Sequence, residues 1–213
     1  MRHLWLILAL VAGAGLARLS TLEPRPTPLD APAQSFSSAR AMTDVRVVAA
    51  RPHPVGSTEN RQVRDYLTAR LRRLGLETRL QRDCAFSLRD EGAAVLGADV
   101  ENLIGVLPGR DRAAPALALM AHYDSAPRSP GAGDDAAGVA VALEVVRAIT
   151  AKGVPARDIV VLLTDGEEPG MLGAQAFFDR DPLAAHIGLV LNLEARGGAG
   201  RAIMFETSRA NGG

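Results

Sequence analysis

Three short apolar runs, each ending in side chains of metal-binding type, constrain the fold of this chain more than any other feature. The runs cover residues 117–121, 159–164 and 189–193. They lead into His122 and Asp124, into the acidic stretch 165–168, and into Glu194. Runs of this length, bounded by polar residues, are typical of strands buried on both faces of a sheet. Open α/β sheets bind ligands beyond the carboxyl ends of their strands, so we expect these side chains to converge in space.

Helical patterns alternate with the predicted strands. Ser57 or Thr58 can cap a helix that Gly75 ends, with apolar residues three and four apart between them. Further helices are predicted over residues 39–50, 136–151 and 171–178, and further strands over 76–81, 100–107 and 187–193, whereas residues 83–98 show no clear period. The pattern predicts an α/β fold with a mostly parallel, mixed sheet sandwiched by helices.

Composition limits the functions and the kinds of metal site that the chain can have. The chain has 24 basic and 24 acidic residues among 213, and its arginines are scattered, so nucleic-acid binding is not expected. Its one cysteine, Cys84, can form neither an intrachain disulfide nor a thiolate zinc site. Any metal must therefore be held by histidine and carboxylates.

The N-terminal region is expected to lie outside the catalytic domain. Residues 4–17 are apolar or small after Met1-Arg2-His3, so residues 1–20 predict a signal peptide or a retained signal anchor. Either one implies export, with the domain outside the cytoplasm and possible membrane association through this segment. Residues 21–38 are rich in proline and predict a linker. The catalytic domain is expected over residues 39–213.

Each polar cluster also has an ordinary structural reading. His122 beside Asp124 could be a satisfied structural pair, Asp134 and Asp135 could cap a helix, and the Glu167-Glu168 turn could be a solvated loop. A carboxylate after a core strand, as at Glu194, is costly to bury unless it is paired or bound to metal. The conjunction of all four clusters at strand and helix ends favours a hydrolytic metal enzyme.

Four motifs in order give the chain a family resemblance. They are Ala-His-Tyr-Asp-Ser at 121–125, Gly-Ala-Gly-Asp-Asp-Ala-Ala-Gly at 131–138, Asp-Gly-Glu-Glu-Pro-Gly-Met-Leu-Gly-Ala-Gln-Ala-Phe at 165–177, and Asn-Leu-Glu-Ala-Arg-Gly at 192–197. The chain resembles the co-catalytic two-zinc metallopeptidases that include aminopeptidase Y. Within them it is most similar to the membrane-anchored branch of vacuolar membrane protease and endoplasmic reticulum metallopeptidase. The resemblance implies the zinc-dependent exopeptidase fold.

Roles for individual residues follow from the resemblance alone. His122 and Glu194 would bind one Zn2+, Asp134 would bridge two, and Glu168 would bind the second. Glu167 matches the general base, and Asp124 matches the carboxylate that orients His122. The substrates would be peptide or protein N-termini, cleaved through a hydroxide between the two metals. His53, in the loop 52–57, is not among the matched ligands.

The sequence departs from the family pattern at one position. The second zinc of the family also takes a histidine that follows the third strand motif, yet His186 is the last histidine here and precedes Glu194. We therefore expect a sequence truncated at its C-terminus. The final zinc ligand, the oxyanion-stabilising side chain and the substrate pocket would lie beyond Gly213.

Three alternatives remain open at this point. A glutaminyl cyclase resembles this fold, needs one zinc and cyclises N-terminal glutamine. Carboxypeptidase specificity is a second possibility. A catalytically inactive receptor or scaffold domain, as in transferrin receptor, is the third. Every matched position within the chain is filled, which weighs against the inactive form.

Overall fold

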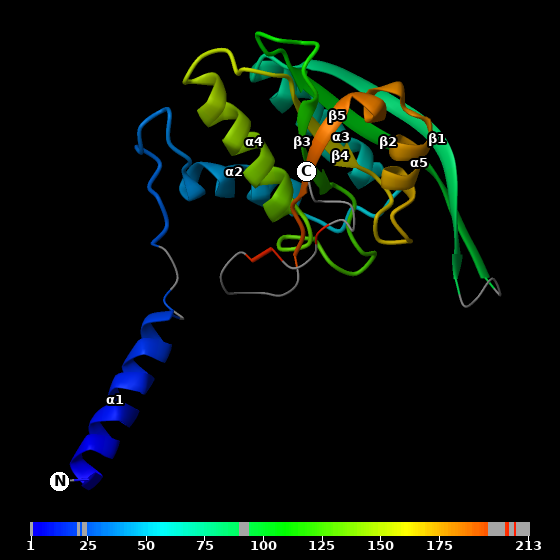
Figure 1. Cartoon of the computed structure of the whole chain (residues 1–213). Coiled ribbons are helices and arrows are strands. Elements are labelled where there is room, and N and C mark those ends of the chain that lie inside the picture. Colours follow the sequence, from blue (N-terminus) through cyan, green and yellow to red (C-terminus); the bar gives the residue numbers. More distant parts are fainter. Residues whose placement is uncertain are drawn as a thin grey trace. The chain divides into compact units, whose positions relative to one another are not determined.

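The structure is a computed structural model that describes residues 2–20, 22, 25–89, 94–195, 203–204 and 207 (Figure 1). The chain divides into two compact units. One comprises residues 1–25 with 197–213, and contains helix α1 (Arg2–Ser20), whose large apolar side chains are exposed. Among the described residues, no helix combines the length and the apolar character needed to cross a membrane. The other unit, residues 26–196, carries all the predicted site residues.

A mixed sheet of five strands forms the centre of the larger unit. Its order is β1 (Glu77–Arg89), β2 (Ala94–Leu107), β4 (Ile159–Thr164), β3 (Ala116–His122), β5 (Ile187–Asn192). Strand β3 pairs in parallel with both β4 and β5, whereas β2 pairs antiparallel with β1 and β4. The expected α/β class and mixed sheet are confirmed. The parallel half places the carboxyl ends of β3, β4 and β5 side by side.

The predicted strands 76–81 and 100–107 are too short, because β1 and β2 form a long hairpin. Their register runs from Glu77 opposite Val106 to Arg89 opposite Ala94. Only residues 103–107 of β2 also pair with β4, so the hairpin continues as a two-stranded ribbon beyond the sheet (Figure 1). Apolar side chains such as Phe86 and Leu88 are exposed there. Among the described side chains of residues 83–98, Ala85 is the one that is buried, against helix α5 (Leu172–Arg180), so this stretch lacks the alternation that reveals a strand.

Helices cover both faces of the sheet. Helices α2 (Ser38–Val48), α3 (Thr58–Arg73) and α4 (Ala136–Thr150) contribute to the core cluster on one face. On the opposite face, α5 packs against β1 and β2, while the fully buried Phe177 of α5 and the 3₁₀ helix η2 (Pro182–His186) join a core cluster with β3 and β4. Strand β4 is buried along its whole length. This layering explains why its sequence is continuously apolar.

Local signals set the ends of α3 as the sequence predicts. The Ser57 hydroxyl accepts a hydrogen bond from the amide of Asn60 at 3.0 Å, which caps the helix. Gly75 adopts a φ of 85° just past the C-terminal end, where glycine is favoured.

The segment 27–38, predicted as part of a linker, packs on the domain. The Ser37 amide donates to Oε1 of the buried Glu144 on α4 at 2.9 Å. Arg40 and Arg147 also bind Glu144, at 3.0 and 2.6 Å, and both arginines donate to backbone carbonyls of residues 29–35. Proline prevents regular structure here, but the arginines supply the hydrogen bonds that an irregular backbone needs.

Candidate metal centre

His122 ends strand β3, and its ring orientation is fixed by Asp124. Nδ1 of His122 donates to the backbone carbonyl oxygen of Asp124 at 3.0 Å and lies 3.5 Å from Oδ1 of the same residue. Both side chains are buried. A hydrogen bond at Nδ1 selects the tautomer whose other nitrogen can bind a metal. Nε2 of His122 accordingly points at Asp134.

The two neighbouring aspartates before α4 have separate roles. Oδ1 of Asp134 lies 2.9 Å from Nε2 of His122, and this side chain is half exposed. Asp135 is buried and caps α4 by accepting from the amide of Gly138 at 3.0 Å. It also accepts from the backbone amide of His122 at 3.3 Å. The capping reading of this pair is therefore correct for Asp135, while Asp134 remains available to a ligand.

Glu194 completes a group of three possible ligands. It follows β5 by two residues, and its Oε1 lies 3.9 Å from Nε2 of His122. One ligand atom each from His122, Asp134 and Glu194 lie within 4.8 Å of one another. Glu168 is not a member of this group.

The turn after β4 carries the two predicted glutamates. The backbone amides of Glu167 and Glu168 donate to Oδ1 and Oδ2 of Asp124, at 3.0 and 3.3 Å. Oε2 of Glu167 lies 4.0 Å from Nε2 of His122. Asp124 thus connects the histidine of β3 to both glutamates of the turn. Sequence reasoning foresaw only its contact with His122.

Charge is concentrated around His122. Burial by itself lowers the pKa of His122, but the carboxylates of Asp124, Asp135 and Asp134 outweigh burial and raise it to about 10. Burial raises the pKa of Asp135 to about 8, a change that the charge of Glu194 increases. Burial raises the pKa of the carboxyls of Glu167 and Glu168, and nearby acidic groups add to the effect. The site therefore favours additional positive charge.

The donor set fits a divalent zinc ion. One imidazole nitrogen and carboxylate oxygens are ordinary zinc ligands, and a histidine whose second nitrogen is hydrogen-bonded is the usual form. A cation between His122, Asp134 and Glu194 would offset the repulsion among the surrounding acids.

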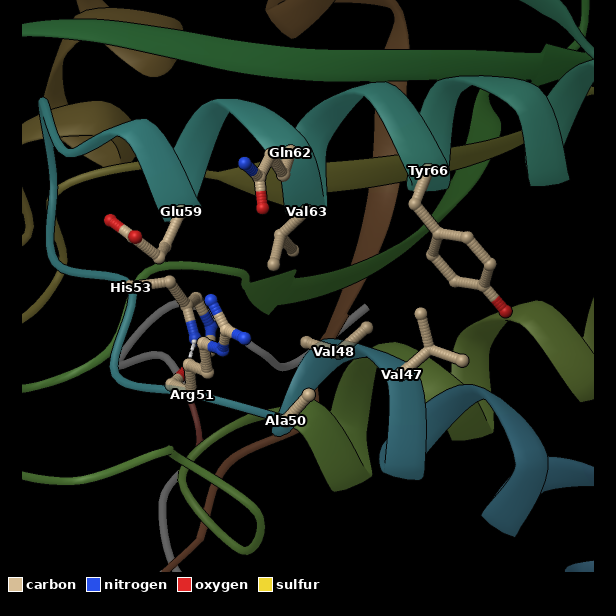
Figure 2. A pocket seen from close by; sticks show the side chains of 9 residues that line it. All are labelled: Val47, Val48, Ala50, Arg51, His53, Glu59, Gln62, Val63 and Tyr66. Carbon is tan, nitrogen blue, oxygen red and sulfur yellow. Dashed lines mark hydrogen bonds between the residues drawn. The ribbon is translucent and has the colours of Figure 1, made fainter.

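His53 lies in a different environment. Its Nδ1 is 2.7 Å from the carbonyl oxygen of Arg51, and its backbone amide donates to the Ser125 hydroxyl at 2.9 Å. The buried ring lines a pocket of about 350 Å³ between α2 and α3, which Figure 2 shows from close by. Val63 and Tyr66 of α3 line the other side of this pocket.

A polar network behind the turn was not foreseen. Asp165, Asn60 and Asn102 are buried, and Asp165 is hydrogen-bonded to both asparagines. Asp165 is the first residue of the third sequence motif, at residues 165–177, and was recognisable as part of it. The two asparagines lie in segments whose apolar patterns predicted only a helix and a strand, and such patterns carry no information about side-chain hydrogen-bond partners.

Comparison with known proteins identifies a peptidase family. Residues 102–212 match the family described as Peptidase family M28. The vacuolar membrane protease of Candida dubliniensis is 37% identical over 166 residues, which cover 76% of this chain and 18% of that protein. The chain thus spans about a fifth of the length of this relative.

Solved structures share the fold. The glutaminyl cyclase of Porphyromonas gingivalis is 28% identical with a TM-score of 0.58, covering 75% of this chain and 59% of that one. BSAP, a zinc aminopeptidase from Bacillus subtilis, is 15% identical with a TM-score of 0.64, covering 76% and 70%. At 15% identity the second likeness concerns the fold alone.

Proposed function

The chain belongs to peptidase family M28, and from this membership we propose that it carries the zinc site of a metallo-exopeptidase, specifically an aminopeptidase. The supporting observation is the convergence of His122, Asp134 and Glu194 beside the carboxylate of Glu167. Carboxylates and histidine gathered at adjacent strand ends match what hydrolysis by a metal-activated water requires.

The residues divide into ligands and a base. His122, Asp134 and Glu194 would hold zinc, with Asp134 shared by a second ion that Glu168 would also bind. Bound zinc supplies Lewis acidity, which lowers the pKa of water and polarises the scissile carbonyl. Glu167 would accept the proton of the attacking water and deliver it to the leaving amine.

Asp124 would hold this arrangement in place. Its contact with Nδ1 keeps Nε2 of His122 free for metal, and its two oxygens bind the amides of Glu167 and Glu168. A single buried carboxylate therefore fixes the ligand and the base relative to each other.

The substrates would be peptides or proteins with a free N-terminus. By analogy with the relatives named vacuolar membrane protease, we propose membrane association through the N-terminal segment, with the domain outside the cytoplasm. A glutaminyl cyclase is the second candidate, favoured by the 28% identity to the P. gingivalis enzyme. A cyclase would release no amino acid from ordinary N-termini.

Hydrolysis of aminoacyl-anilides tests the proposal. The complete gene product, loaded with zinc, is assayed on anilides with free and with acetylated amines, and on an N-terminal glutaminyl peptide. Cleavage of the free-amine anilides alone would support an aminopeptidase. Cyclisation of the glutaminyl peptide without anilide cleavage would replace this proposal with the cyclase.

A further inference from the structure

We propose that Asp165 and Asn60 form a buried clamp that positions the turn bearing Glu167 and Glu168; its catalytic meaning rests on the proposed function. Asp165 follows strand β4 directly, and Asn60 lies in the first turn of α3. Each is only 2% exposed, so water does not compete for their contacts. Neither residue belongs to the group of possible metal ligands.

Every polar group of Asp165 has a partner from another part of the fold. Its Oδ1 accepts from Nδ2 of Asn60 at 3.0 Å, and its Oδ2 accepts from the amide of Glu101 at 3.1 Å. Its own amide donates to Oδ1 of Asn102 at 3.0 Å. Its carbonyl oxygen accepts from the amide of Gly173 at 2.9 Å. Helices α3 and α5 and strand β2 therefore fix one residue.

The position of Asp165 constrains the positions of Glu167 and Glu168, because few residues separate them along the chain. Only Gly166 lies between Asp165 and Glu167, and it adopts a φ of 66° that other residues rarely take. Beyond it, the amides of Glu167 and Glu168 are bound by Asp124. The turn is thus held from β3 at one end and from α3 at the other. Loss of the second attachment would let both carboxylates shift against His122.

Asn60 is itself held firmly. Its amide donates to the capping hydroxyl of Ser57, and its Nδ2 also lies 3.5 Å from the carbonyl oxygen of His53. Gly173 closes the opposite side, where a Cβ would overlap the Asp165 carbonyl oxygen and Oδ1 of Asn102. A rigid support of this kind is what a precisely placed base requires.

A buried hydrogen bond stabilises a fold wherever it lies, so the test must separate positioning from stability. Exchanging the partners provides this separation. In Asn60→Asp combined with Asp165→Asn, the new asparagine can accept from the Glu101 amide and donate to the new aspartate. Asn60→Asp alone instead opposes two carboxylates, whereas Asp165→Asn alone is still satisfied if the Asn60 amide turns over. Gln62→Glu makes the same amide-to-carboxylate change on α3, at a residue that lines the separate pocket in Figure 2.

The complete gene product is studied by amide hydrogen exchange and by Co2+ titration. We expect Asn60→Asp to speed exchange at Glu167 and Glu168 at least tenfold relative to Val161 in β4. The exchanged pair should restore slow exchange, and Gln62→Glu should leave it unchanged. Co2+ affinity should fall about tenfold in Asn60→Asp and recover in the pair.

Two results would overturn the clamp. One is faster exchange that is uniform across the glutamates and Val161, which would indicate a role in stability alone. The other is unchanged exchange at the two glutamates in Asn60→Asp. Failure of the wild-type chain to bind Co2+ would count against the proposed function instead, while the exchange data would still decide the clamp.

Discussion

The backbone amide of Glu167 donates a 3.0 Å hydrogen bond to Oδ1 of Asp124, the atom that also lies 3.5 Å from Nδ1 of His122. The two ends of neighbouring strands β3 and β4 are thereby tied through one carboxylate. This carboxylate therefore holds the imidazole ring of His122 and the backbone of Glu167 relative to each other.

Replacement of Asp124 should therefore weaken metal binding. In Asp124→Asn, an NH2 group replaces one of the two carboxylate oxygens. This donor would face either a glutamate amide or Nδ1 of His122, which are themselves donors and need an acceptor. We expect the affinity for Zn2+ to fall about 10- to 100-fold, measured by competition with a chromophoric chelator. Equal affinity in the variant and the wild type would remove Asp124 from its orienting role.

Glu167 should be dispensable for metal and essential for turnover. Glu167→Gln keeps the shape of the side chain but cannot accept a proton. We expect an unchanged metal content, measured by elemental analysis, and a fall in kcat of about 10²- to 10⁴-fold in the complete protein. Loss of metal from this variant would show that Glu167 is a ligand and that the roles of the two glutamates are exchanged.

Asp134 should be required for metal at both proposed positions. Its Oδ1 lies 2.9 Å from Nε2 of His122, so Asp134→Asn removes a charge from the centre of the site. We expect reduced occupancy of both ions when metal content is measured after dialysis. Asp99→Asn, at an exposed residue of β2, provides the control and should retain its metal. A loss of one ion only would contradict the bridging role.

The pH dependence of stability should reflect Glu144. Burial opposes ionisation of this group, but hydrogen bonds from Arg147 and Arg40 outweigh burial and hold its pKa below the usual 4.5. Because the folded-state pKa is lowered, its contribution is complete above about pH 4.5 and is lost as pH falls through the lower, folded-state value.

Urea unfolding of Glu144→Gln checks this dependence. At pH 7 the variant should be less stable than the wild type by about 1 to 3 kcal/mol, because the arginines lose a charged acceptor. The difference should shrink as the pH falls below 4.5 toward 3. A difference that stays constant over this range would mean that the charge of Glu144 adds no stability.

The apolar runs predicted the parallel half of the sheet because burial on both faces leaves a continuous signal. The runs before His122 and Asp165 became β3 and β4, and the capping signals placed α3. The contacts of residues 27–38 were missed because their partners, Arg40 and Arg147, are polar and lie in other elements. Hydrogen bonds to irregular backbone leave no periodic pattern in a sequence.

The candidate site was predictable as far as its residue types allowed. His122, Asp134 and Glu194 lie together, as their places at strand and helix ends predicted. The separation of Asp134 from its capping neighbour Asp135 required coordinates, since both could fill either position. The partnership of Asn60 with Asp165 joins residues 105 apart, and neither the length nor the spacing of a motif encodes such a pairing.

Helix α4 connects the candidate metal centre to the irregular segment that precedes α2. It begins beside His122 through Asp135, and about two and a half turns later Glu144 binds Ser37 and Arg40 of the preceding segment. Ser38 in turn binds Thr27, so the irregular chain at residues 27–37 is attached to this helix. A force applied to the chain at Thr27 would therefore be carried through Glu144 and along α4 toward the backbone amide of His122, which Asp135 binds.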